Sequence, residues 1–228
     1  MKPRSLRAAL ILFAGCALAA VGAVGAVGAV GAGAPPDWPD TPLARLEALA
    51  LIETLNDEIL SSPSATLTLE RWCREHALAE QPVILAHRTE AAGDVPSAQP
   101  RQDLQVSARE SVRYRRVELT CGEHVLSVAE NWYVPDRLTA QMNHLLETTQ
   151  TPFGKVVQPL GPHRETIAVQ LLWAPLDAHA DAPSDRLQLP PALFEHRAIL
   201  YTRQHQPIAE VHEVYQRDLL AFPEPHLP

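Results

Sequence analysis

Apolar and polar residues alternate along residues 112–135, and this period of two predicts two β-strands joined by a tight turn. Gly122 and Glu123 form the predicted turn. The apolar positions are Val117, Leu119 and Cys121 on the first strand, and Leu126, Val128, Trp132 and Val134 on the second. Glu130 interrupts the second stripe, where a carboxylate is costly to bury unless it is paired.

The segment before this hairpin predicts two helices and a strand. Residues 43–60 carry apolar side chains at helical spacing, which predicts a helix that buries Leu43, Leu46, Leu49, Ala50, Ile52, Leu55 and Ile59. Ser64 opens a second helix that reaches about Leu78. Residues 83–87 read as a short strand after Pro82, and residues 91–105 as a polar loop.

The segment after the hairpin predicts one more helix, a turn and three strands. Residues 136–148 read as a helix, and Thr151-Pro152-Phe153-Gly154 as a turn that feeds a short helix. Strands are expected at residues 165–173, 195–202 and 207–215, with a charged loop at 177–188. About six strands in hairpins, with grouped helices, predict an α+β fold with an antiparallel sheet.

The first 36 residues read as a targeting segment. Lys2, Arg4 and Arg7 precede an uncharged run of Ala, Gly, Val and Leu that lasts until Asp37. This pattern is typical of an export signal. Three outcomes stay open: cleavage in the Ala/Gly run, lipidation at Cys16, or retention as a membrane anchor through residues 1–34. Each places the rest of the chain outside the cytoplasm, in the periplasm or attached to the membrane.

The exported part begins with a Pro-rich linker at residues 37–42, followed by an expected domain at 43–220 and a tail at 221–228. Without the three N-terminal cations, 16 basic residues face 27 acidic ones, a net charge of −11. This balance argues against a nucleic-acid partner. Cys73 and Cys121 could form a disulfide in an oxidising compartment. No zinc-binding spacing, phosphate-binding glycine loop or nucleophile elbow is present in the sequence, so these patterns indicate no metal site and no reaction.

Four segments, taken in order, resemble chorismate pyruvate-lyase, the enzyme that makes 4-hydroxybenzoate for ubiquinone. They are Ser64-Ala65-Thr66 with Glu70, residues 116–135 ending in Val-Pro, Thr151-Pro152-Phe153-Gly154, and a last hairpin with Arg197, Pro207 and Glu213. The resemblance covers about residues 43–220. It implies a chorismate lyase-like fold that encloses a small carboxylate or aromatic acid.

The resemblance also assigns roles. Arg116 corresponds to the arginine that binds a substrate carboxylate, as a guanidinium fork suits this group. Ala65 and Phe153, with Gly154 beside it, correspond to backbone donors at helix starts. The alternatives are a cross-strand ion pair for Arg116, for example with Glu118, and ordinary capping and packing for the others.

Glu213 corresponds to the carboxylate that handles the departing oxygen or a proton. It stands one position later than the family pattern, where His212 takes the expected place. Alternation puts Ala209, Val211, Glu213 and Tyr215 on one face and His212 on the other, which favours Glu213 as the inward residue. The reaction that the resemblance implies is elimination of pyruvate from chorismate without a cofactor.

Three functions are therefore open for the chain. Chorismate is made in the cytoplasm, whereas this domain is expected outside it, so an exported lyase lacks an obvious supply of substrate. The main rival is a non-catalytic binder of an aromatic acid or other small carboxylate, since a related fold serves as an effector-binding domain in some transcription regulators. A membrane-attached structural protein is the third, and the sequence leaves the oligomeric state open.

Overall fold

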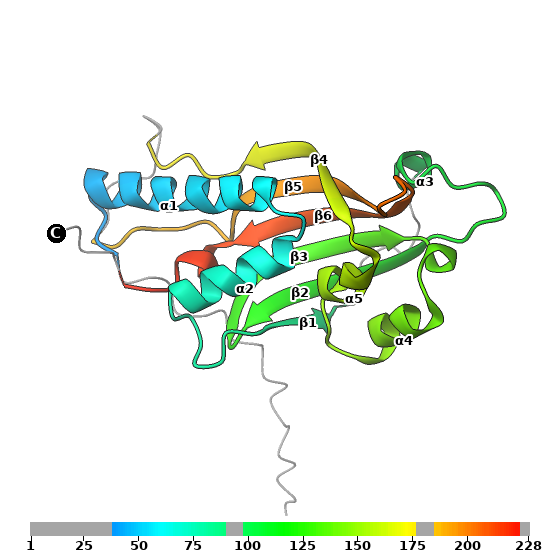
Figure 1. The fold of residues 1–228 in the computed structure, drawn as a ribbon. Coiled ribbons are helices and arrows are strands. Elements are labelled where there is room, and N and C mark those ends of the chain that lie inside the picture. Colours follow the sequence, from blue (N-terminus) through cyan, green and yellow to red (C-terminus); the bar gives the residue numbers. More distant parts are fainter. Residues whose placement is uncertain (1–37, 90–97, 177–184, 224–228) are drawn as a thin grey trace, which may run out of the picture.

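The sheet is antiparallel and has six strands in the order β1-β2-β3-β6-β5-β4 (Figure 1). The computed structural model describes residues 38–89, 98–176 and 185–223. The strands are β1 (Ile84–Arg88), β2 (Arg113–Cys121), β3 (His124–Tyr133), β4 (His163–Leu171), β5 (Ala192–Tyr201) and β6 (Pro207–Gln216). The predicted α+β class with about six strands is confirmed. The predicted targeting segment, residues 1–36, lies outside the described residues, as does the end of the predicted tail.

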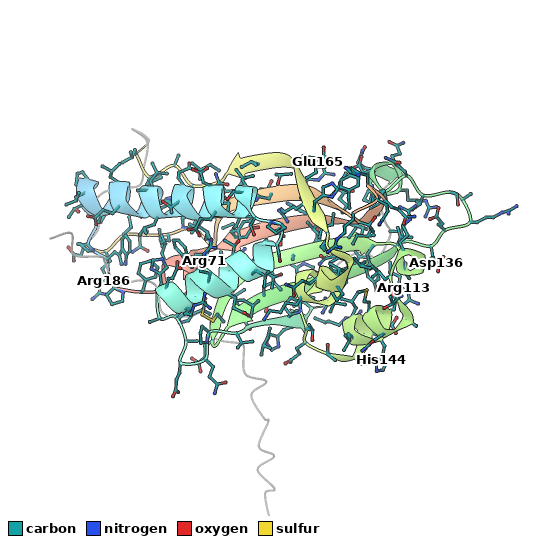
Figure 2. All side chains as sticks on the ribbon, viewed as in Figure 1. Arg71, Arg113, Asp136, His144, Glu165 and Arg186 are labelled. Carbon is teal, nitrogen blue, oxygen red and sulfur yellow. A yellow bond between two sulfur atoms is a disulfide. The ribbon has the colours of Figure 1, made fainter. Side chains whose placement is uncertain are left out.

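The helices are α1 (Pro42–Ser61), α2 (Ala65–Glu75), α3 (Ala98–Asp103), α4 (Ala140–Thr148) and α5 (Phe153–Val157). Short 3-10 turns lie at Pro135–Arg137, Gln158–Leu160 and Arg217–Leu220. Helix α3 occupies part of the segment that was expected to be a polar loop. In Figure 1, α1, α2, α4 and α5 lie on the same face of the sheet. Arg71 on α2, labelled in Figure 2, forms an ion pair with Glu58 of α1 at 2.9 Å.

Helix α1 begins where its capping residues predict, but it buries a different stripe from the one expected. The Thr41 hydroxyl accepts a hydrogen bond from the backbone N–H of Ala44, and Pro42 fills the first turn. The buried residues are Ala44, Ala48, Ile52, Leu55 and Ile59. Leu43 and Leu46 were expected in the core and are 59% and 51% exposed. The alanines take their place against the sheet, which periodicity among large apolar residues alone does not reveal.

A β-bulge decides which residues of β3 face the helices. Leu119 pairs with Ser127, whereas Thr120 pairs with Val125, so Leu126 is the extra residue on β3. Beyond the bulge, the buried face carries Ser127, Ala129, Asn131 and Tyr133, and the opposite face carries Val128, Glu130 and Trp132. The predicted second stripe is therefore wrong for Val128 and Trp132, because one inserted residue reverses the faces of the strand residues that follow, whereas Val134, just beyond the strand, is buried.

Two hydrophobic clusters lie between the sheet and the helices. The larger lies beneath α1 and α2 and includes Ile52, Leu69 and Leu126, and the smaller lies beneath α4 and α5 and includes Leu146 and Val157. A disulfide between Cys73 on α2 and Cys121 at the end of β2, with a Cα–Cα distance of 6.5 Å, fastens α2 to the sheet. The expected pairing of these two cysteines is confirmed.

Candidate functional site

A cavity lies where the two hydrophobic clusters meet, between the sheet and the starts of α2 and α5. Its volume is about 30 Å³, the space of about two water molecules. The sheet contributes Val117, Leu119, Ala129, Asn131, Arg164, Leu200, Val211 and Glu213, and the helix starts contribute Pro63, Ser64, Ala65, Thr66, Phe153 and Gly154. The wall therefore combines apolar side chains with a few polar groups, as is usual for small-molecule sites.

Four of the five residues expected at a site line this one cavity. Ala65 begins α2 directly after Ser64, whose hydroxyl caps the helix by accepting from the Leu67 N–H. Phe153 and Gly154 begin α5, and Glu213 enters from β6. Their common location follows from the fold. Their roles as ligand contacts stay a prediction.

Glu213 is the inward residue of β6, as the alternation predicted. Its side chain is 8% exposed, and its Oε2 accepts hydrogen bonds from Arg164 Nη1 at 2.7 Å and from the Tyr215 hydroxyl at 3.2 Å. His212 lies on the opposite face, where its ring nitrogens approach Glu195 at 3.1 Å and Glu130 at 3.6 Å. The question of which of the two residues faces the cavity is thus answered in favour of Glu213.

Arg116 is not at the cavity, and its expected pairing with Glu213 in one pocket is wrong. It lies in one cross-strand row with Glu130 and His212, on the face away from the helices. Its Nη1 donates to the Thr89 hydroxyl at 2.9 Å, and its Nε is 3.9 Å from Glu130. The alternative of a cross-strand ion pair for Arg116 is confirmed, but the partner is Glu130 and not Glu118. The physical reason is strand parity: Val117 and Leu119 point inward, so Arg116 points outward.

The inward arginine of β2 is its neighbour, Arg115. It is 2% exposed, and none of its three guanidinium nitrogens has a hydrogen-bond partner among the described residues. Its cross-strand neighbour Asn131 lines the cavity, whereas Arg115 itself does not, so the guanidinium lies beside the cavity at its β2 end. Burial, together with the positive charge of Arg88, lowers the pKa of Arg115 to about 10. The group is therefore still charged at neutral pH. Extending the stripe of Val117 and Leu119 back by two residues would have identified it.

A second buried arginine, Arg164 on β4, forms the other end of the site. Its side chain is 4% exposed and it lines the cavity. Burial acts to lower the pKa of Arg164, but the charges of Glu213 and Tyr215 and hydrogen bonding to them together outweigh it and raise the pKa. Sequence reasoning missed Arg164, because the strand was expected to begin at Glu165, directly after it, and nothing local marks a partner 49 residues away.

A buried polar cluster continues from this ion pair towards α1. His196, opposite Glu213 on β5, is fully buried, and its Nε2 lies 2.7 Å from Oδ1 of Asn56. Burial and the charge of Arg164 lower the pKa of His196 to about 4, so the ring is neutral at neutral pH and donates to Asn56. Burial also raises the pKa of the Tyr215 hydroxyl, as does Glu213. Tyr215 is thereby a hydrogen-bond donor and not an acid at this site.

The start of α5 contacts the start of α2 and covers the cavity as a lid. Gly154 allows the two helices to approach each other closely at this contact. A Cβ at this position would lie 2.9 Å from Ser64 Oγ and 3.0 Å from Thr66 Oγ1. Lys155, the next residue, forms an ion pair with Glu70 of α2. A side chain at 154 would therefore press the two helix starts apart.

Gly154→Ala should lower the free energy of unfolding by about 1–2 kcal/mol. Overpacking costs about 1–3 kcal/mol, and the better helix propensity of Ala recovers up to about 1 kcal/mol. Urea unfolding measures the change. In a Ser64→Ala background, where one clashing oxygen is gone, Gly154→Ala should cost less. A stabilised Gly154→Ala variant would contradict the close contact.

The described residues hold no group of three or more histidine, cysteine or acidic side chains that could bind a metal ion. Within the same residues, no helix combines the length and the apolar character that crossing a bilayer requires.

Comparison with known proteins gives the chain a family. The uncharacterized protein y4mC of Sinorhizobium fredii (strain NBRC 101917 / NGR234) is 44% identical to it over 195 residues, which are 82% of each chain. The chain belongs to the y4mC family. No family model matches it. The resemblance of this chain to chorismate pyruvate-lyase therefore rests on short sequence motifs alone.

Solved structures with a similar arrangement are distant. PhnF from Mycobacterium smegmatis is 16% identical, with a TM-score of 0.43, and the match covers 72% of this chain and 68% of PhnF. The ligand-binding domain of a putative GntR-family transcriptional regulator from Bordetella bronchiseptica is 19% identical, with a TM-score of 0.37 and coverage of 58% and 82%. Scores at this level transfer no ligand or activity to the y4mC family.

Proposed function

We propose that this protein binds a small organic carboxylate in the cavity beneath α2 and α5, and that it is a binder and not a lyase. The observation that carries the proposal is Arg115, a charged side chain that is 2% exposed and has no hydrogen-bond partner among the described residues. A buried charge without a partner is strongly destabilising. A ligand carboxylate that pairs with the guanidinium removes this cost, which gives the fold a reason to keep the arginine.

Entry of a ligand requires the lid to move. The cavity of about 30 Å³ is far smaller than the roughly 300–1,000 Å³ of sites that hold drug-sized ligands. The lid is the short helix α5, which rests on α2 through Gly154 and the Lys155–Glu70 ion pair. Because this ion pair is partly exposed, breaking it costs little. We therefore expect α5 to move away from α2 when the ligand binds.

The lyase hypothesis loses the pairing of its two central residues. Arg116 lies on the opposite face of the sheet from Glu213, so the two cannot hold one substrate. Glu213 already accepts hydrogen bonds from Arg164 and Tyr215 on Oε2. Its role is thus better explained as a partner for Arg164 than as a group that handles a departing oxygen.

The disulfide between Cys73 and Cys121 supports the expected export of the domain, because disulfides persist mainly outside the cytoplasm. Export in turn favours a binder over an enzyme that consumes a cytoplasmic metabolite. A reporter fused after Pro42 that is active only in the cytoplasm would refute this location.

Thermal unfolding of the full chain with benzoate and with benzamide tests the binding proposal. Benzoate should raise the melting temperature, and benzamide, which has the same shape without the charge, should raise it much less. Equal effects would contradict a charge-selective site. Incubation with chorismate should release no pyruvate, and steady release would restore the lyase.

A further inference from the structure

Arg164 uses only part of its guanidinium group. Nη1 donates to Glu213 at 2.7 Å, whereas Nε and Nη2 are buried and have no hydrogen-bond partner among the described residues. These two nitrogens form one edge of the planar group, with two N–H bonds that point the same way. Since Arg164 lines the cavity, this edge is a candidate contact for a bound molecule.

The charges at the two ends of the site differ. Arg164 and Glu213 form an ion pair whose net charge is zero, whereas Arg115 has no anionic partner among the described residues. Arg88, which acts on Arg115, is exposed, so water already solvates it. The buried part of the site therefore has one unpaired positive charge, and a ligand with a single negative charge neutralises it. A second carboxylate placed at Arg164 would lie beside Glu213 with only one cation between them.

We infer that the ligand is a monoanion: its carboxylate pairs with Arg115, and its far end is a neutral hydrogen-bond acceptor that meets Nε and Nη2 of Arg164. The inference rests on the proposed function. The guanidinium of Arg164 lies at Glu213 on β6. One strand separates β6 from β2, which carries Arg115, so the backbones of β6 and β2 are about 10 Å apart. A molecule of one ring, or a short chain, is therefore of the right length.

Three para-substituted benzoates of similar size test the charge and the acceptor separately. 4-Carbamoylbenzoate is a monoanion with a neutral carbonyl, 4-methylbenzoate is a monoanion with an apolar end, and terephthalate is a dianion. Calorimetry on the full chain should show 4-carbamoylbenzoate binding about threefold to tenfold more tightly than 4-methylbenzoate, the effect of one neutral hydrogen bond. Terephthalate should bind at least tenfold more weakly than 4-carbamoylbenzoate. Its tighter binding would overturn the inference.

Arg164→Met alone leaves Glu213 buried without its partner and can prevent folding. The double variant Arg164→Met/Glu213→Gln removes both charges of the pair, so it is the better probe. Its affinities for 4-carbamoylbenzoate and 4-methylbenzoate should become equal, and this ratio is the readout because a general change in the cavity affects both compounds alike. An unchanged preference would refute the role of Arg164.

The outcomes separate this inference from the proposed function. Binding of all three compounds in the wrong order refutes the monoanion and leaves the carboxylate site at Arg115 intact. Absence of binding for all three at millimolar concentration overturns both.

Discussion

Reduction of the disulfide between Cys73 and Cys121 should lower the free energy of unfolding by about 4 kcal/mol. The bond closes a loop with a sequence separation of 48 residues, and opening it returns conformational freedom mainly to the unfolded chain. It also releases α2, which carries Ala65 at the cavity, from the end of β2. Urea unfolding with and without dithiothreitol measures the loss.

The variant Cys73→Ser/Cys121→Ser is the control for the effect of the reductant. It should be as unstable as the reduced wild type, and dithiothreitol should not change it further. If the reduced wild type loses less than about 1 kcal/mol, the bond does not hold α2 to the sheet as we describe.

In contrast to reduction of the disulfide, Arg115→Met should stabilise the ligand-free protein and raise its free energy of unfolding by about 2 kcal/mol. Replacing buried charges by apolar side chains of similar volume stabilises proteins by about 1–4 kcal/mol. Met keeps an unbranched side chain in this buried position and removes a charge that has no described partner. Most core substitutions destabilise, so this sign is diagnostic.

Arg116→Met is the matched control, because the two arginines are adjacent in sequence and lie on opposite faces of the sheet. The Arg116 side chain is 33% exposed and its contact with Glu130 is long, so its loss should change stability by less than about 1 kcal/mol. A loss of stability in Arg115→Met would mean that the guanidinium serves the fold and not a ligand.

The sequence predicted the parts of this fold that follow a simple period. Alternation on β6 correctly placed Glu213 inward, and Ser64 and Pro152 marked the helix starts at Ala65 and Phe153. Helix and strand starts are local signals, so they can be recognised without knowledge of the tertiary structure.

The predictions that failed depend on one-residue shifts or on distant partners. The bulge at Leu126 reversed the faces of β3, and the motif spacing led to Arg116 although strand parity favours Arg115. Arg164 could not be recognised, since its role arises only when β4 and β6 lie in the same sheet. For the arginine, strand parity is thus a better indicator than the spacing of the motifs.

The central claim is that Arg115, and not Arg116, holds a ligand carboxylate. Calorimetric titration of the full chain with 4-carbamoylbenzoate tests it directly on the wild type, Arg115→Met and Arg116→Met. Loss of a charge-assisted contact is worth about 1.5–3 kcal/mol, so Arg115→Met should weaken binding about tenfold to a hundredfold, and Arg116→Met should bind as the wild type does. Unchanged affinity in Arg115→Met, or an equal loss in both variants, would contradict the account.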